Sequence, residues 1–132
     1  MAGSYIENLT LTGNANLNGT GNLLNNIIMG NAGDNIIIGE GGDDVLTGGG
    51  GEDLFIFDIG SGEDTILDYI IGEDAFDISS LIAAGLEFGP EDVTQINATD
   101  ALVDLGGGNT VTVVNVNATQ LYDDMAEYNA VV

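Results

Sequence analysis

The sequence predicts an all-β protein built as a β-solenoid. Three observations carry this prediction: a nine-residue repeat, a glycine that opens each repeat and strand-forming residues that close it. Between positions 21 and 56 the chain divides into the consecutive units GNLLNNIIM, GNAGDNIII, GEGGDDVLT and GGGGEDLFI. Every unit has Asn or Asp at its sixth place and a large apolar residue at its eighth. A repeat of fixed period indicates an architecture in which each unit packs on its neighbours.

Each unit reads as a turn followed by a very short strand. The first six residues are rich in glycine, which is the residue that best tolerates positive φ in tight turns. The last three residues are mostly β-branched or aliphatic, so strands are expected at 27–29, 36–38, 45–47 and 54–56. A strand of three residues is not stable alone, so these strands must stack to bury a continuous core.

The length and charge of the chain limit what it can bind. It has 132 residues, enough for one domain, with 22 Asp plus Glu and no Lys, Arg or His, giving a formal charge of −22. Without cationic side chains, we expect no binding to nucleic acid and no direct binding to membranes. The hydrophobic fraction of 44% is too high for a disordered acidic tail. No run of about 18 apolar residues predicts a membrane span.

The composition also argues against an enzyme. Without His, Lys or Cys, His/Cys zinc sites and most nucleophile–base pairs cannot form. No pair of carboxylates is marked as the separated acid and base of a hydrolase. The negative charge must instead be balanced by monovalent salt or by hard divalent cations held by oxygen ligands, in which the sequence is rich.

Residues 39–56 then carry a recognisable motif. Their pattern resembles the calcium-binding nonapeptide repeat of RTX (repeats-in-toxin) proteins, which are exported by type I secretion. The RTX consensus is Gly-Gly-x-Gly-x-Asp-x-apolar-x, and the matching residues are Gly42, Asp44, Leu46, Gly51, Asp53 and Phe55. Residues 21–38 depart from it, because Asn26 and Asn35 replace the Asp and Leu24 replaces the second loop glycine.

The resemblance implies a right-handed parallel β-roll in which two units make one turn. Each loop would then stack on the loop 18 residues away, with several Ca²⁺ ions between stacked loops, bound by sixth-place carboxylates and loop carbonyls. The implied pairs are Asn26 with Asp44 and Asn35 with Asp53. The segment 60–64 comes two residues late and would pair Asp64 with Asp44.

The resemblance also implies a set of calcium ligands, acting through side-chain or backbone oxygens. Sites bearing Asn should be weaker, because a neutral amide replaces a charge. The last two ligands come from similarity to the segment that closes RTX rolls in serralysin-type proteases, and a solvated acidic loop is the alternative for them. The full set is Asn26, Asn31, Gly33, Asn35, Glu40, Gly42, Asp44, Gly49, Gly51, Asp53, Gly60, Gly62, Asp64, Asp68 and Asp74.

Other acidic side chains are expected to be solvated. At the fifth place of the loops, Asp34, Asp43 and Glu52 should have a solvated side chain and a ligating or structural backbone. Near the carboxyl end, Asp123, Asp124 and Glu127 should simply be solvated.

The expected organisation has three parts. Residues 1–4 are interpreted as a cloning remnant, which would make the chain a fragment. Residues 5–80 form the roll, with a degenerate, calcium-free first turn (5–20), the repeats (21–56) and a closing segment (57–80). Residues 81–132 form a cap of β-strands with one short helix and a region resembling a type I secretion signal, although Asn129 stands where Asp is usual before three apolar residues.

Within the cap, alternation and turn residues predict strands at 93–96, 101–105 and 110–116, with a turn at 106–109. Asn117 followed by Gln120 resembles a capping box and opens a helix over 118–128. Helical spacing puts Leu121, Tyr122, Met125 and Tyr128 on one face of that helix.

One outer face of the roll needs a cover. The seventh- and ninth-place residues Ile36, Ile38, Leu54 and Ile56 would all lie outside one sheet, and such an apolar patch is unusual on a soluble domain. We expect the carboxyl-terminal strands, or the Leu121/Met125/Tyr128 face, to cover it. Self-association through this 36–38/54–56 sheet is the alternative.

The predicted function follows from the resemblance. The chain should be a calcium-binding module that folds on Ca²⁺ binding outside the cell and supports export of a larger protein by a type I ABC exporter. The alternative is an assembly module of an RTX adhesin or S-layer protein that mediates Ca²⁺-dependent association at the cell surface.

Overall fold

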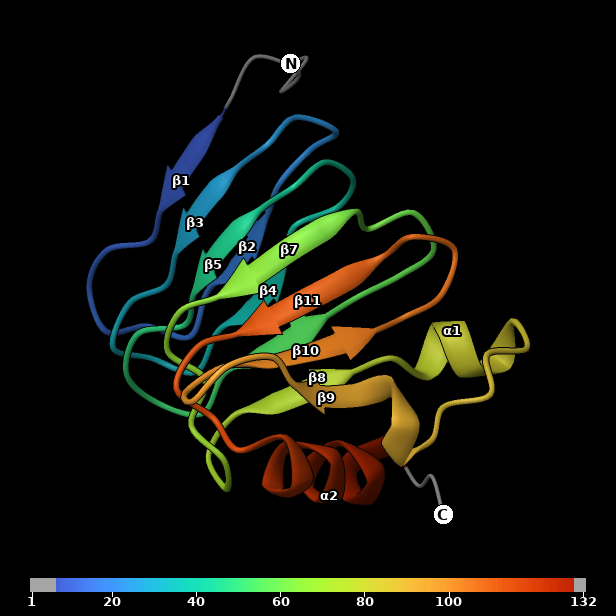
Figure 1. The fold of residues 1–132 in the computed structure, drawn as a ribbon. Helices are drawn as coiled ribbons and strands as arrows, with labels where there is room; N and C mark the ends of the chain where they lie inside the picture. The colour runs from blue at the N-terminus through green and yellow to red at the C-terminus, as the bar shows by residue number, and fades with distance from the viewer. Residues whose placement is uncertain (1–6, 130–132) are drawn as a thin grey trace.

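The computed structural model describes residues 7–129, so the predictions for residues 1–4 and for the last three residues lie outside the described part. The chain coils between two facing sheets of short strands (Figure 1). The strands of the repeats have the predicted bounds, with β3 at Ile27–Met29, β4 at Ile36–Ile38, β5 at Val45–Thr47 and β6 at Leu54–Ile56.

Strands alternate between the two sheets, as a parallel β-roll requires. One sheet has the order β1-β3-β5-β7-β11-β10-β9 and the other the order β2-β4-β6-β8. The degenerate first turn contributes β1 (Asn8–Thr10) and β2 (Asn18–Thr20), and the closing segment contributes β7 (Glu63–Ile66) and β8 (Ala75–Asp77). All pairs among these eight strands are parallel, so the predicted β-roll is confirmed.

The number of residues in each turn increases along the roll. Ile27 pairs with Val45, 18 residues on, whereas Val45 pairs with Thr65 and Leu54 with Ala75. The later turns therefore hold two and three extra residues, which are accommodated in the loops. The eighth-place residues Ile28 and Phe55 are fully buried, and with their equivalents Ile37 and Leu46 they fill the interior between the sheets.

The carboxyl-terminal cap extends one sheet and closes the end of the roll. Strand β11 (Thr110–Val113) pairs in parallel with β7, and β10 (Ala101–Asp104) and β9 (Val93–Gln95) follow antiparallel. Helix α2 (Ala118–Asn129) packs on β8, β9 and β10, below the last coil in Figure 1. Its start is capped as expected, since Asn117 Oδ1 accepts the Gln120 N–H at 3.1 Å.

Two short helices were not predicted. Helix α1 covers Ser79–Ala83, and a 3-10 helix covers Pro90–Asp92. The sequence offered no signal for them, because elements of five and three residues are too short to present a helical period.

The predicted cover over the 36–38/54–56 sheet was also wrong. Strands β9–β11 join the opposite sheet, and α2 lies beyond β8 with Leu121 and Met125 fully buried in the core. Tyr128, Asp124 and Glu127 of α2 line a groove together with Leu54 of β6. The outer side chains of β4 and β6 are half-buried.

Candidate metal-binding loops

The loops between strands stack in two columns, one on each side of the roll. The first column holds loops 21–26, 39–44 and 60–64, and the second holds 12–17, 30–35, 48–53 and 70–74. The pairing within the columns is the predicted one. The backbone N–H of Asn26 donates to Asp44 Oδ1 at 2.8 Å, and that of Asn35 donates to Asp53 Oδ1 at 2.9 Å. The N–H of Asp44 donates in turn to Asp64 Oδ1 at 2.8 Å.

Three of these carboxylates each keep one oxygen without a partner. Asp44 is 1% exposed and Asp53 and Asp64 are each 2% exposed, and the Oδ2 atom of each accepts no hydrogen bond. A buried charge is costly unless it is paired. Because the chain has no cationic side chain, only a proton or a bound cation can compensate these oxygens.

The electrostatics of the loops agree with this. Burial, the largest cause, raises the pKa of Asp44 and of Asp53 to about 6, against the lowering effect of the backbone hydrogen bonds. Burial raises the pKa of Asp64 to about 8, and the nearby charges of Asp44 and Asp43 add to the rise. The ionised form of each group is thus disfavoured until a positive charge is supplied.

The glycine at the first place of these units makes room for the carboxylate. A Cβ atom at Gly39 would lie 2.3 Å from Asp44 Oδ2, and one at Gly48 would lie 2.4 Å from Asp53 Oδ2. Such distances are well inside van der Waals contact. The glycine that opens these units therefore has a packing role as well as a conformational one.

Glycines at the second and fourth places bring backbone carbonyls close to the neighbouring loop. Gly49 and Gly51 have φ of +86° and +80°. A Cβ atom at Gly49 would lie 2.4 Å from the Asn31 carbonyl oxygen, and one at Gly51 would lie 2.7 Å from that of Gly33. Positive φ recurs at the predicted ligands Gly42, Gly60 and Gly62, and at Glu40, whose side chain is exposed.

The oxygen donors of these loops fit a calcium ion. Within residues 7–129 no three carboxylates gather at one point. A cation here would therefore draw on a buried carboxylate and on the carbonyls of two stacked loops. Ca²⁺ takes six to eight oxygen ligands in flexible geometry, including backbone carbonyls, whereas Mg²⁺ demands a near-ideal octahedron.

The two acidic residues of the closing segment are held differently. Asp68 accepts the N–H groups of Gly48 and Gly49, one on each oxygen, both at 2.8 Å. Asp74 accepts from Asp53 N at 3.0 Å and from Ile70 N at 2.8 Å. Both side chains therefore fix loop backbone, and their ligation of calcium remains a prediction.

The fifth-place side chains are exposed, as expected, and two of them also hold the backbone of the following loop. Asp34 Oδ1 accepts the N–H of Glu52 at 2.7 Å, and Asp43 Oδ1 accepts that of Glu63 at 2.9 Å. Both aspartates remain exposed. They form a second ladder in which the side chain points toward the following loop, whereas the sixth-place carboxylates point toward the preceding one.

Sequence reasoning also missed Asn109, which continues the first column into the cap. Its Oδ1 accepts the Gly62 N–H at 3.0 Å, across 47 residues. The run Gly106–Gly107–Gly108–Asn109 before β11 was interpreted as a simple turn. Its likeness to a repeat loop followed by a strand was the signal available.

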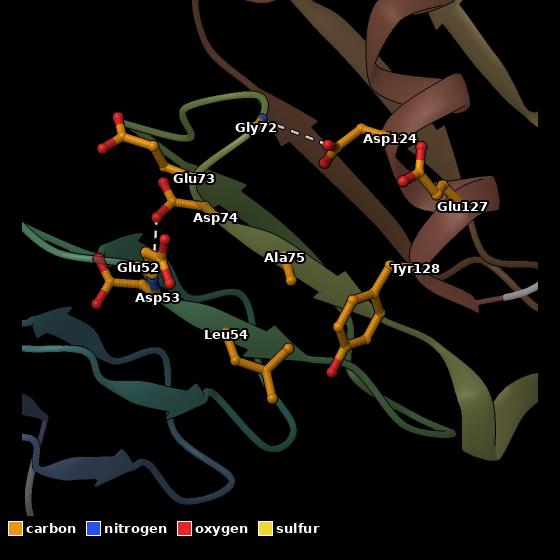
Figure 2. Close-up of a pocket in the computed structure, with 10 residues that line it drawn as sticks. All are labelled: Glu52, Asp53, Leu54, Gly72, Glu73, Asp74, Ala75, Asp124, Glu127 and Tyr128. Atoms are coloured by element: carbon orange, nitrogen blue, oxygen red, sulfur yellow. Dashed lines mark hydrogen bonds between the residues drawn. The ribbon is translucent and has the colours of Figure 1, made fainter.

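Asp124 is a further correction, because it is not merely solvated. Its Oδ2 accepts the Tyr69 hydroxyl at 2.6 Å, and this hydroxyl also lies 3.0 Å from the Asp74 carbonyl oxygen. Figure 2 shows Asp124 on α2 facing Gly72, whose N–H it accepts at 3.4 Å. Asp124 and Gly72 line an acidic groove of about 620 Å³ beside the last loop, together with Glu52, Glu73 and Glu127.

The fold and loops define the class of protein as a parallel β-roll of glycine-rich acidic repeats. Residues 20–55 match a family model described as RTX calcium-binding nonapeptide repeat, in four copies. These residues are therefore RTX repeats, and the chain carries a calcium-binding repeat module of that family.

The comparison with solved structures includes the solution structure of the AlgE6R3 subunit from the Azotobacter vinelandii mannuronan C5-epimerase. It is 24% identical, with 90% of this chain and 81% of that chain covered and a TM-score of 0.36. No curated protein matches this chain. Among the described helices, none has the length and apolar character needed to cross a bilayer.

Proposed function

We propose that the chain is a calcium-dependent folding module, in which Ca²⁺ binds at Asp44, Asp53 and Asp64 and drives closure of the roll. The observation that carries this proposal is the set of three buried Oδ2 atoms without partners in a chain that has no cationic side chain. The carbonyls of the stacked loops would complete each coordination sphere.

Calcium binding and folding of the roll are thermodynamically linked. The sites exist only where loops stack, so the unfolded chain offers no equivalent, and the binding free energy adds to the free energy of folding. Each ion also offsets two of the 22 formal negative charges, which otherwise oppose the compact state.

The module would respond to the difference in calcium concentration between the cytosol and the outside of the cell. Extracellular calcium modules typically bind at about 10⁻⁴–10⁻³ M, a range in which a cytosolic chain stays unloaded. An unfolded chain can pass through a type I ABC exporter and fold after release. This role, and the secreted location that goes with it, rest on the RTX repeats alone.

The test is a far-UV circular dichroism titration with Ca²⁺ from a calcium-free starting point, with Mg²⁺ as the control. The expected result is a cooperative coil-to-β transition with Ca²⁺ and none with Mg²⁺ at the same concentration. A chain already folded as β-structure without calcium at neutral pH would contradict the proposal.

An assembly module of an adhesin or S-layer protein is the second candidate. It is favoured by the apolar outer residues of β3, since Ile27 is 46% and Met29 45% exposed. Sedimentation at several protein concentrations separates the two functions. An export and folding module stays monomeric when calcium is added, whereas an assembly module forms oligomers only with calcium.

A further inference from the structure

The amino-terminal repeat loops differ from the others in what their sixth-place side chain touches. Asn35 is 1% exposed, and its Nδ2 donates to the Leu17 carbonyl oxygen at 3.0 Å. Asn26 is 3% exposed, and its Nδ2 donates to the Glu7 carbonyl oxygen at 3.1 Å. Both acceptors belong to the preceding coil. The amide nitrogen thus points toward the preceding coil, as the Oδ1 atoms of the sixth-place aspartates do.

The second-place residue explains why only the aspartates keep an oxygen without a partner. Asn31 N donates to Asn35 Oδ1 at 3.0 Å within its own loop. Gly49 has the same place in the next loop of the column, but it has positive φ and donates to Asp68 Oδ2 at 2.8 Å. Asp53 Oδ2 therefore lacks the donor that Asn35 Oδ1 has.

The Asn31 side chain fills the rest of the space between loops 12–17 and 30–35. Its Nδ2 donates to the carbonyl oxygens of Thr12 at 3.1 Å and Ala15 at 3.0 Å. Its Oδ1 accepts Gly33 N and Asn35 Nδ2, both at 2.9 Å. A carboxamide offers two donor hydrogens and two acceptor sites, so this group has no bonding capacity left.

We propose that the carboxamides of Asn31 and Asn35 close the space between loops 12–17 and 30–35, so that it holds no cation and calcium filling of this column begins at Asp53. The inference rests on the proposed function, because it states where calcium binding stops. The carbonyls of Thr12, Ala15 and Leu17 are oxygens that a cation would need, and each already accepts a hydrogen bond from a side-chain amide. Asn26 and the Glu7 carbonyl form the equivalent contact in the first column.

The backbone carbonyls of loop 30–35 remain available to ligate a cation in the next space of the column, between loops 30–35 and 48–53. The carbonyl oxygens of Asn31 and Gly33 lie on the side of loop 48–53, where Asp53 Oδ2 has no partner. The same loop is thus neutral and hydrogen-bonded on one side and carbonyl-lined on the other. A cation on the second side would still use the predicted ligands Asn31 and Gly33 through their main chain.

The test counts bound Ca²⁺ by equilibrium dialysis and metal analysis, and measures thermal unfolding at saturating Ca²⁺, for the full chain and three variants. Asn31→Ala and Asn35→Ala should lower the unfolding temperature and leave the number of bound ions unchanged. Asp53→Asn should lower that number by one. Loss of an ion from either asparagine variant would overturn the inference, whereas an unchanged number in Asp53→Asn would contradict the proposed function alone.

Because Asn35 is buried, its variant could fail to fold, so a measurement on the unaltered chain stands beside it. In the calcium-loaded protein, NMR should find slow hydrogen exchange at the side-chain amides of Asn31 and Asn35. The exposed Asn115 provides the fast reference. Exchange at Asn31 and Asn35 as fast as at Asn115 would also overturn the inference.

Discussion

The backbone N–H of Asp44 donates to Asp64 Oδ1 at 2.8 Å, across two stacked loops that lie 20 residues apart. The carboxylate of Asp44 in turn accepts the N–H of Asn26 on the loop before it. Each sixth-place aspartate therefore positions the loop that precedes it. An ion bound at one level would order the backbone of the next, which makes filling of a column cooperative.

Asp44→Ala should raise the calcium midpoint of folding more than Asp34→Ala does. Asp44 is buried and bridges three loops of its column, whereas Asp34 is exposed although it accepts the Glu52 N–H. A hydrogen bond to a charged group contributes about 1.5–3 kcal/mol, or roughly tenfold or more in the midpoint. A circular dichroism titration of both variants measures the difference, and equal midpoints would contradict the observed stacking register.

Gly48→Ala should weaken calcium binding, and Gly50→Ala provides the matched control. A Cβ at Gly48 would lie 2.4 Å from Asp53 Oδ2, whereas one at Gly50 would have its nearest neighbour, Ala32 Cα, at 3.5 Å. Overpacking of this kind costs about 1–3 kcal/mol. Neither glycine at 48 nor at 50 has the positive φ found at Gly49 and Gly51, so backbone strain does not confuse the comparison.

Thermal unfolding at fixed Ca²⁺ concentration, combined with the calcium midpoint, reports both effects. Gly50→Ala should be neutral or slightly stabilising, since alanine restricts the unfolded chain. If the two variants behave alike, the first-place glycine has no steric role at the carboxylate.

The strands of the repeats could be predicted to the residue, because the nine-residue period can be recognised from neighbouring residues alone. Strands β3–β6 all fall at the last three places of their units. The pairing of Asp44 with Asp64 could also be predicted, because the late loop 60–64 still ends in the sequence Gly-x-Asp. Local repetition thus specifies both the coil and the column in which each loop stands.

The rest depended on contacts between distant residues. No local feature of the sequence indicates whether β9–β11 extend the sheet of β7 or cover β4 and β6. That choice depends on which sheet edge the last coil leaves open. The Tyr69–Asp124 bond joins residues 55 apart, and the Asn31 network depends on which backbone groups the preceding coil presents. The second-place Asn of units 21–29 and 30–38 was the sequence signal for that network.

Tyr69→Phe should destabilise the attachment of α2 to the roll. The hydroxyl of Tyr69 donates to Asp124 Oδ2 at 2.6 Å, in a site where Tyr69 is only 4% exposed. Losing a buried hydrogen bond to a charged acceptor costs about 1.5–3 kcal/mol. Denaturant unfolding at saturating Ca²⁺ measures this loss, with the exposed Asp123→Asn as the control that should change little.

A double-mutant cycle isolates the interaction itself. Asp124→Asn combined with Tyr69→Phe should cost less than the sum of the two single changes. Strict additivity would mean that the short contact between the two side chains contributes nothing to the stability of the cap.

Without calcium, the stability of the roll should fall as pH rises. In the folded chain the pKa is about 6 for Asp44 and Asp53 and about 8 for Asp64, with burial as the main cause. An unfolded Asp titrates near pKa ~3.9. Between these values the folded state binds more protons than the unfolded state, so the free energy of unfolding decreases with increasing pH. The stabilisation is complete below about pH 4 and is lost as the pH passes through the folded pKa values.

Calcium reverses this dependence, because an ion must displace the protons from the carboxylates it binds. We expect the calcium midpoint of folding to fall as pH rises from about 5.5 to 8.5, across the raised pKa values of the three aspartates. Asp64→Asn removes the group with the highest pKa and should flatten the upper part of this profile. Far-UV circular dichroism in calcium-free buffer, which follows the β-structure present at each pH, and calcium titrations at each pH measure the two trends. A calcium-free stability that rises with pH would mean that these carboxylates are already compensated in the folded chain.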